Sequence, residues 1–289
     1  MFFGSLVAIV SPFDESGIDI SALKALIDQH ISSGTSGIIV CGTTGEGCLM
    51  SDRERNILIK TAIEYADKRI PIIVGCTAAS TEHALHLSKD AELKGADGLL
   101  IMTPYCVKPT QKGIFEHFKT IHDNTNIPII LYNHPGRSGV DIAIETLVEL
   151  FKLERIVTLK DSNPDMTRIK DFLPFVKGTN KTLLSGDDPT VIDYLKEGGS
   201  GCISVTANIA PKHCADVITA FKNGDIDEAQ RLNDEILPLH LALVCETNPQ
   251  PIKYAMSKIG LIKPIIKLPL VMTDGKNAET IDNVLNLIV

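Results

Sequence analysis

One pattern repeats eight times along this 289-residue sequence: a short apolar run is followed by an amphipathic segment. Each cycle takes roughly 25 to 30 residues, which suits a strand, a helix and their connections. Strands separated by helices pair in parallel, and eight such units can close into a barrel. The pattern therefore predicts the α/β class and a (β/α)8 TIM barrel, with strands at about residues 6–10, 37–41, 71–75, 97–102, 128–132, 156–160, 182–185 and 201–205.

The main alternative to a barrel is an open, doubly wound sheet. That fold would be expected to carry a Gly-x-Gly-x-x-Gly turn after an early strand, and the sequence has none. After Gly224 the strand-like runs stop, and helical patterns alone follow at about residues 226–244, 251–259 and 278–288. We therefore expect a barrel over residues 1–224 and a helical C-terminal subdomain over residues 225–289.

Several helix starts carry local signals. The run Ser51-Asp52-Arg53-Glu54 is typical of a capping box and predicts a helix that extends to about residue 67. A further helix is expected over about residues 165–176. The pair Asp187-Asp188 precedes Pro189, which favours a helix N-cap over a metal site or a pair of acid–base carboxylates.

Composition and charge exclude several classes of function. The net charge of −8, from 28 basic and 36 acidic residues without a basic stripe, argues against nucleic-acid binding. No run approaches the roughly 18 apolar residues of a membrane-spanning helix, and the apolar N-terminus without a basic leader indicates a strand and not a signal peptide. Seven cysteines without a Cys-x-x-Cys pair predict reduced thiols in a cytoplasmic protein, and eight histidines without His-Glu-x-x-His predict no metal. With nucleic acid disfavoured by charge, small molecules are the expected partners.

Lys160 is the residue that most directly suggests chemistry. If residues 156–160 form a strand, Val157 and Leu159 share one face while Thr158 and Lys160 share the other, which would line the interior of a barrel near its catalytic end. Desolvation there lowers the pKa of a lysine, and the free amine can attack a carbonyl to form a Schiff base. The alternative is that Lys160 is the first solvated residue after the strand.

Other strand ends supply groups that could meet Lys160. Tyr132 has the parity of Ile130 and should also point inward, where a phenol could relay protons; the alternative is a core tyrosine. Thr43 and Thr44 lie between glycines and could hold a carboxylate, or they could form an ordinary turn.

Three more positions lie at or just beyond strand ends. Arg137 follows residues 128–132, and its planar guanidinium suits a carboxylate, although a surface salt bridge is the common alternative. Gly186 and the 201–203 edge, which ends at Ile203, could bring bare backbone close to a ligand.

Taken together, short segments resemble a known family, and they occur in order over nearly the whole chain. The segments are Gly42-Thr43-Thr44-Gly45-Glu46, Thr103-Pro104-Tyr105, Tyr132-Asn133-x-Pro135-Gly136-Arg137, Lys160-Asp161, Gly186-Asp187-Asp188, Ser204-Val205-Thr206-Ala207-Asn208 and Asn248-Pro249-x-Pro251-x-Lys253. This set resembles the dihydrodipicolinate synthases, within the N-acetylneuraminate lyase superfamily of class I aldolases.

The resemblance implies a reaction and residue roles. Lys160 would form a Schiff base with pyruvate, Tyr132 would donate and accept protons, and Thr43 would belong to the proton relay. Thr44 and the Ile203 backbone would contact pyruvate, Gly186 would be a further substrate-binding position, and Arg137 would bind the carboxylate of L-aspartate 4-semialdehyde. The implied product is 4-hydroxy-tetrahydrodipicolinate in the diaminopimelate and lysine pathway, made without a cofactor by a homotetramer built as two dimers.

The sequence also departs from the family pattern. A second aromatic residue usually follows Tyr105 and completes the proton relay of a neighbouring subunit, but Cys106 stands here. Because a thiol is shorter and a weaker donor, the relay is expected to be incomplete or bridged by water. In lysine-inhibited relatives, polar groups line an effector pocket beside this interface, and the matching positions here include Ala79 and His83. Feedback inhibition by lysine is therefore not expected.

Two other functions remain open at this stage. A lyase acting on sialic acid or a 2-keto-3-deoxy sugar acid would share the lysine, the tyrosine and the Gly-x-x-Gly-Glu loop, although Arg137 and the segment 248–253 argue against it. A barrel that binds a keto acid without turning it over would use Lys160 as a charge anchor only.

Overall fold

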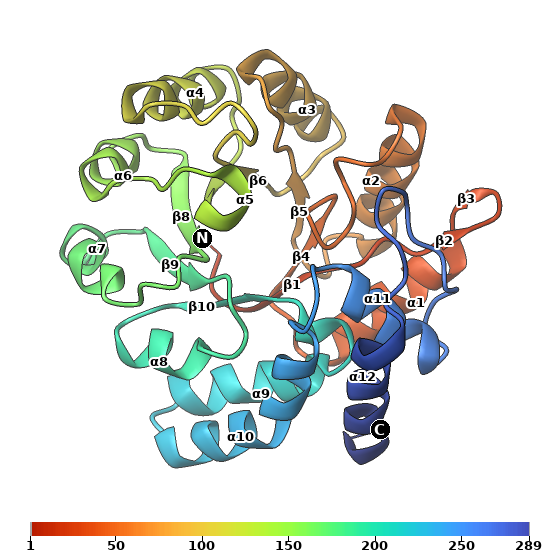
Figure 1. Cartoon of the computed structure of the whole chain (residues 1–289). Helices are drawn as coiled ribbons and strands as arrows, with labels where there is room; N and C mark the ends of the chain where they lie inside the picture. The colour runs from red at the N-terminus through yellow and green to blue at the C-terminus, as the bar shows by residue number, and fades with distance from the viewer. Residues whose placement is uncertain (1, 289) are drawn as a thin grey trace. The chain divides into compact units, whose positions relative to one another are not determined.

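The computed structural model describes residues 2–288 and contains a closed barrel of eight parallel strands (Figure 1). Around the barrel the strands follow the order β1-β10-β9-β8-β7-β6-β5-β4. The predicted (β/α)8 fold is therefore confirmed. The barrel strands are β1 (Gly4–Ala8), β4 (Gly37–Val40), β5 (Ile72–Gly75), β6 (Gly98–Met102), β7 (Ile129–Asn133), β8 (Ile156–Asp161), β9 (Thr182–Ser185) and β10 (Gly201–Ser204).

Helices follow the strands as the periodicity predicted. Ser51 and Glu54 form the predicted capping box, in which each side chain bonds the backbone N–H of the other residue. Among residues 2–288 no helix is both long and apolar enough to cross a membrane. The main helices are α1 (Ile20–Ser32), α2 (Asp52–Ala66), α3 (Thr81–Leu93), α4 (Gln111–Asp123), α6 (Ile144–Phe151), α7 (Arg168–Val176), α8 (Val191–Lys196), α9 (Pro211–Lys222), α10 (Ile226–Ala242), α11 (Gln250–Lys258) and α12 (Gly275–Ile288).

Two helix starts differ from the prediction because acidic side chains bond within their own turns. Asp187 does not cap α8: its carboxylate accepts from the hydroxyl of Thr190 at 2.7 Å, and Thr190 is the N-cap residue. Asp165 accepts from the N–H and hydroxyl of Thr167, so α7 begins at Arg168 and not at residue 165. The short elements β2 (Phe13–Asp14), β3 (Gly17–Ile18), α5 (Pro135–Ser138) and η1 (Thr206–Asn208) were not predicted.

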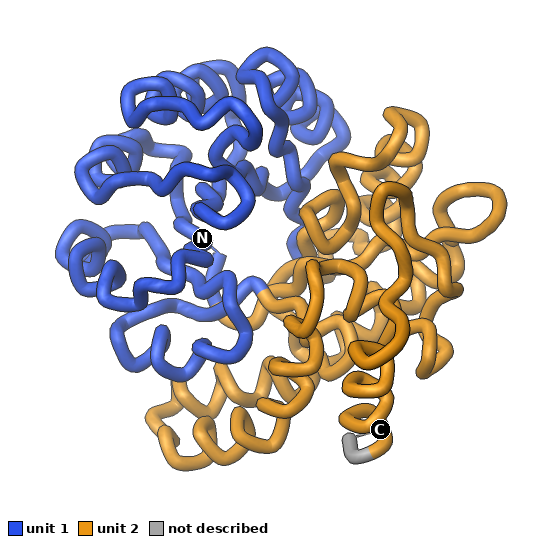
Figure 2. Tube along the Cα trace, in the orientation of Figure 1, with its two compact units in different colours: residues 1–3, 71–203 blue, residues 4–70, 204–289 orange. Residues whose placement is uncertain are grey.

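The chain divides into two compact units (Figure 2). Unit 1 contains residues 71–203 with the first residues of the chain, and unit 2 contains residues 4–70 and everything from Ser204 onward. Within unit 2, α10 packs against both α9 and α12. The boundary between a barrel and a C-terminal subdomain at residue 224 stays a prediction.

Unit 1 holds the strands that carry most of the predicted site. Strands β6, β7 and β8 are buried along their whole length, as expected for parallel strands covered on both faces. Their registers place Met102 opposite Tyr132, and Tyr132 opposite Lys160. The parallel ladder thus brings the carboxyl ends of three consecutive strands level with one another.

Candidate active site

Lys160 lies near the end of β8, where it is only 5% exposed. Its ammonium nitrogen is 4.3 Å from the centre of the Tyr132 ring, and the two residues are direct partners in the β7–β8 ladder. The alternative of a solvated lysine beyond the strand is therefore excluded by its burial. The predicted shared parity of Lys160 and Tyr132 agrees with this geometry, which places an amine against a phenol ring.

His134 also belongs to this cluster, although sequence reasoning passed over it. Its ring meets the Tyr132 ring edge-on, with 5.8 Å between the centroids. Burial, followed by the positive charges of Arg137 and Lys160, lowers the pKa of His134 to about 4, so the imidazole is neutral near pH 7. Its position two residues beyond Tyr132 was the signal that could have identified it.

Arg137 is half-buried in α5, the single helical turn that follows β7. The N–H groups of Arg137 and Ser138 both donate to the carbonyl of His134 at 3.0 Å, which closes the turn. The Ser138 hydroxyl donates to Val140 O at 2.7 Å, which holds the exit of the turn. The sequence predicted a turn-rich loop here, and the structure adds a helical turn that contains Arg137.

Gly186 directly follows β9, and Ile203 lies in β10. These two strands come next to β8 in the order around the barrel. A Cβ atom at Gly186 would lie 2.9 Å from Lys160 Cε and 2.0 Å from Ser162 Oγ, so a side chain there would displace the lysine. Ile203 is buried in β10. The glycine therefore leaves room for Lys160 itself, a reason that differs from the predicted approach of bare backbone to a ligand.

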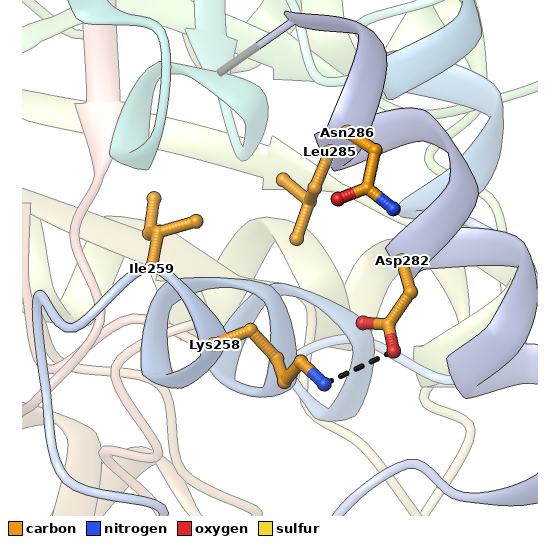
Figure 3. A pocket seen from close by; sticks show the side chains of 5 residues that line it. All are labelled: Lys258, Ile259, Asp282, Leu285 and Asn286. Carbon is orange, nitrogen blue, oxygen red and sulfur yellow. Dashed lines mark hydrogen bonds and ion pairs between the residues drawn. The ribbon is translucent and has the colours of Figure 1, made fainter.

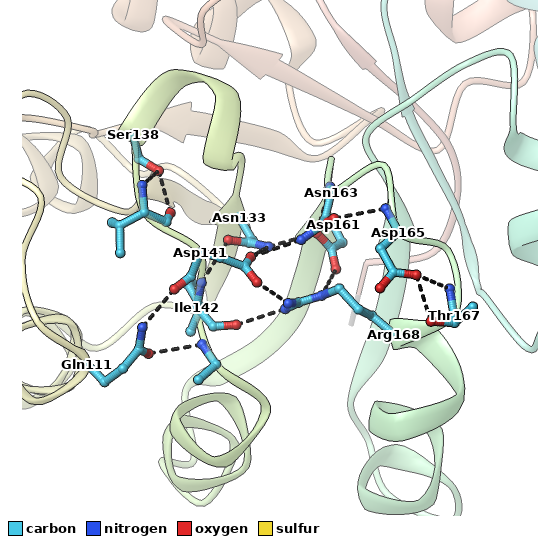
Figure 4. A network of polar contacts seen from close by, with 12 residues as sticks. Gln111, Asn133, Ser138, Asp141, Ile142, Asp161, Asn163, Asp165, Thr167 and Arg168 are labelled. Atoms are coloured by element: carbon cyan, nitrogen blue, oxygen red, sulfur yellow. Dashed lines mark hydrogen bonds and ion pairs between the residues drawn. The ribbon is translucent and has the colours of Figure 1, made fainter.

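Directly behind the strand ends lies a polar network that the sequence did not reveal (Figure 4). Asn133 and Asp161 each follow a predicted site residue and point to the opposite face of their strands. The amide of Asn133 donates to Asp161 at 2.9 Å and to Asp141 at 2.8 Å, and Arg168 pairs with Asp141. The contacts join two strand ends, a loop and the start of α7.

Thr43 and Thr44 belong to unit 2, in the loop that follows β4. Cys41 adopts a left-handed φ of 56°, which ends the strand one residue before the prediction. Thr44 is buried and its hydroxyl accepts a hydrogen bond from the side chain of Asn248 at 3.0 Å. Thr43 is half-buried, and its carbonyl accepts from Glu46 N at 3.0 Å.

Glu46 closes the same loop through a buried ion pair. Its carboxylate is 2.5 Å from the ammonium of Lys253, and neither side chain is exposed to solvent. The second carboxylate oxygen accepts from the backbone N–H of Lys267 at 2.7 Å. Two sequence segments that support the family resemblance, 42–46 and 248–253, are thus in direct contact.

Cys106 is exposed, in the loop that follows β6. Its backbone has a left-handed φ of 73°, and Val107 beside it is 61% exposed. Tyr105 is half-buried, and its carbonyl accepts from Val107 N at 2.9 Å. The thiol therefore lies at the surface of this unit, and its part in a relay stays a prediction.

A pocket of about 390 Å³ lies between α11 and α12 (Figure 3). Lys258 and Asp282 in its wall face each other at 3.0 Å, so each charge is already compensated. Within residues 2–288 no three His, Cys, Asp or Glu side chains are grouped as metal ligands would be. We assign this pocket no part in the chemistry.

Comparisons with known proteins agree with the sequence resemblance. Residues 1–288 match the model of the Dihydrodipicolinate synthetase family. The 4-hydroxy-tetrahydrodipicolinate synthase of Thermodesulfovibrio yellowstonii is 44% identical over 285 residues, which cover 99% of this chain and 98% of the relative. Dihydrodipicolinate synthase from Aquifex aeolicus superposes with a TM-score of 0.96 at 38% identity, covering 99% of this chain and 98% of that one.

A third relative was solved with a ligand. The chloride-inhibited dihydrodipicolinate synthase from Acinetobacter baumannii, complexed with pyruvate, superposes with a TM-score of 0.95 at 42% identity, covering 99% of this chain and 98% of that one. The matches span both units and include the segments that carry the candidate site. The chain therefore belongs to the dihydrodipicolinate synthetase family.

Proposed function

We propose that this enzyme, a lyase of the class I aldolase type, is a 4-hydroxy-tetrahydrodipicolinate synthase that condenses pyruvate with L-aspartate 4-semialdehyde. The observation that carries the proposal is the buried Lys160 amine, 4.3 Å from the Tyr132 ring centre at the ends of two adjacent parallel strands. A buried amine beside a phenol is the arrangement that imine chemistry requires, since one group attacks while the other moves protons.

In the first half-reaction Lys160 Nζ adds to the ketone carbon of pyruvate. The carbon–oxygen bond breaks after Tyr132 delivers a proton to the oxygen, so water leaves and an iminium remains. The iminium withdraws electrons from the adjacent methyl group, which loses a proton and becomes an enamine. We assign Thr43 to the proton relay, and Thr44 and the Ile203 backbone to pyruvate binding, as the family resemblance implies. Gly186 belongs to the same substrate-binding site, where it leaves room for Lys160.

In the second half-reaction the enamine carbon attacks the aldehyde carbon of L-aspartate 4-semialdehyde. Arg137 binds the carboxylate of that substrate, which fixes the orientation of the aldehyde. The substrate amine then attacks the imine carbon, the ring closes, and the carbon–nitrogen bond to Lys160 breaks. The product is 4-hydroxy-tetrahydrodipicolinate, and the lysine returns to its free form.

The substrates, assembly and location form the rest of the proposal. Pyruvate is supported by the relative from Acinetobacter baumannii, which was solved with it. We propose a cytoplasmic homotetramer built as two dimers, in the diaminopimelate and lysine pathway, and we expect no feedback inhibition by lysine. Sedimentation of the purified protein and an inhibition curve with lysine test these two points.

Borohydride trapping tests the chemistry. Pyruvate with borohydride should leave one reduced pyruvyl group, which peptide mapping places on Lys160 in the native protein. Lys160→Arg keeps the positive charge but cannot form an imine, so it should show no adduct and no turnover. A protein that binds pyruvate but yields no adduct would instead be the keto-acid-binding barrel.

A second assay separates the synthase from its nearest chemical alternative. The same preparation is supplied with pyruvate and L-aspartate 4-semialdehyde, and in parallel with sialic acid or a 2-keto-3-deoxy sugar acid. The proposal predicts condensation in the first mixture and no cleavage in the second. Cleavage of a sugar acid at a higher kcat/KM than the condensation would contradict it.

A further inference from the structure

The polar network behind β7 and β8 includes four side chains that we call the strand-end cluster: Asn133, Asp141, Asp161 and Arg168 (Figure 4). Asn133 donates one amide group to both carboxylates, at 2.9 Å to Asp161 and 2.8 Å to Asp141. Arg168 donates through Nη1 to Asp141, and its Nε lies 3.7 Å from Asp161. Each side chain of the cluster therefore contacts at least two others.

The cluster fixes the loop between β7 and α6, which carries Arg137. Asn133 Oδ1 accepts from Ile142 N at 3.2 Å, and Arg168 Nη2 donates to Ile142 O at 2.8 Å. The carbonyl of Asp141 accepts from the side chain of Gln111 at 2.7 Å. The far end of the loop is therefore tied back to the strand from which it leaves.

The site residues depend on this cluster to different degrees. Tyr132 and Lys160 are held by the β7–β8 ladder, which continues through the pair Asn133 and Asp161. Arg137 lies in a single helical turn outside the ladder, so its position depends on how the loop is anchored. Disturbing Asp141 should move the arginine more than it moves the lysine.

Charge makes Arg168 essential to the cluster. Two carboxylates face one guanidinium, and the side chains of Asp161 and Arg168 are 7% and 11% exposed. Burial raises the pKa of Asp161, while the bond from Asn133 and the charge of Arg168 act against that rise. Without Arg168, two nearby carboxylates would repel each other and the loop would lose its anchor.

We propose that Asp141 and Arg168 are positioning residues that hold Arg137 for the second substrate, and that they act on the condensation step without acting on imine formation. The inference rests on the proposed function, because it assigns Arg137 to the carboxylate of the aldehyde substrate. A displacement of about 1 Å in a group that orients a substrate can lower the rate roughly 100-fold.

The decisive experiment measures both half-reactions in Asp141→Asn. This variant keeps the oxygen that accepts from Asn133 but turns an amide toward Arg168 in place of a carboxylate. The rate of borohydride trapping with pyruvate should stay within about twofold of the native rate, whereas KM for L-aspartate 4-semialdehyde should rise roughly 10-fold or more. Arg168→Lys should shift KM in the same direction, since lysine cannot bond two partners in a fixed plane.

Asp165→Asn is the matched control. Asp165 is exposed near the start of α7 and contributes to the field around Arg168, but its side chain bonds Thr167 and does not contact the loop that carries Arg137. Both half-reactions should be unchanged in this control. Asn163→Ala removes the 3.1 Å bond that Asn163 donates to Asp141 and the 2.9 Å bond that it accepts from Asp165 N. Because Asp141 keeps its partners Asn133 and Arg168, this variant should raise the same KM by a smaller factor.

The outcomes separate the two proposals. A fall in the rate of pyruvate trapping by the same factor as the rise in KM for L-aspartate 4-semialdehyde would show a general structural role and overturn the inference. Unchanged KM values in Asp141→Asn, Arg168→Lys and Asn163→Ala would also overturn it. If Asp141→Asn does not fold, the Asn163→Ala result decides. Absence of any pyruvate adduct in the native protein would overturn the proposed function, and this inference with it.

Discussion

Replacing Lys253 by methionine removes one half of an ion pair that solvent does not reach. The Lys253 ammonium bonds the carboxylate of Glu46 at 2.5 Å and Ser11 O at 3.1 Å, and it lies 4.3 Å from the centre of the Phe13 ring. Both side chains of the ion pair are 0% exposed. Methionine has a similar length and fills the space, so the change isolates the charge.

The expected loss follows from what the change leaves behind. Glu46 keeps its bond from Lys267 N at 2.7 Å but loses its counter-charge. Leaving one partner of a buried pair uncompensated costs about 3–5 kcal/mol of the free energy of unfolding. Adding Glu46→Gln to Lys253→Met removes the unpaired charge and should recover part of that loss, and the double-mutant cycle then measures the coupling between the two residues.

Urea unfolding followed by circular dichroism measures the effect, with Lys258→Met as the control. Lys258 belongs to the same helix and also pairs with a carboxylate, but the two side chains are 49% and 34% exposed. An exposed pair contributes about 0.2–1 kcal/mol, so the control should stay close to the native protein. A loss in Lys253→Met no larger than in Lys258→Met would refute the reasoning.

Four further predictions concern the site and pH. Tyr132→Phe should keep the fold and slow pyruvate trapping by roughly 100-fold, measured by quenched time courses, because proton transfer is lost. Gly186→Ala should reduce adduct formation by roughly 10-fold or more, measured by mass spectrometry, since its Cβ would lie 2.9 Å from Lys160 Cε. Cys106→Tyr should preserve or raise turnover; a large fall with assembly intact would contradict the relay argument. Burial lowers the pKa of His117 from 6.5 to about 4, so below pH 6.5 the unfolded chain takes up a proton that the folded state does not, and stability falls until about pH 4. Urea midpoints at pH 7.5 and 5 should show this fall, and His117→Gln should make it smaller.

The sequence was a good guide to features that depend on local periodicity. Alternation along residues 128–132 and 156–160 placed Tyr132 and Lys160 on matching faces, and the ladder register agrees. The capping box from Ser51 to Glu54 spans four residues and was predicted from those residues alone. Such features need only a short window, because neighbouring residues on one strand or helix determine them.

Contacts between distant segments were beyond this kind of reasoning. Glu46 and Lys253 are 207 residues apart, and Arg168 meets Asp141 across 27 residues. Neither pair has a periodic signal, since the contact exists only once the elements are packed. The predicted helix starts at Asp165 and Asp187 were wrong for a different reason. An aspartate can either cap a helix or bond within a turn, and the sequence does not distinguish the two.

Unit 2 combines an early and a late part of the chain, which affects the order in which its contacts can form during synthesis. Asn208 accepts from Val10 N and donates to Ala8 O, and Glu46 pairs with Lys253. These contacts of the N-terminal segment can form only after residues some 200 positions later in the chain have been made. Unit 1 is almost one continuous stretch, residues 71–203, and is made before those partners. Residues 4–70 therefore lack these hydrogen-bond and ion-pair partners while residues 71–203 are being made, and the polar groups that the partners later satisfy stay exposed to solvent during translation.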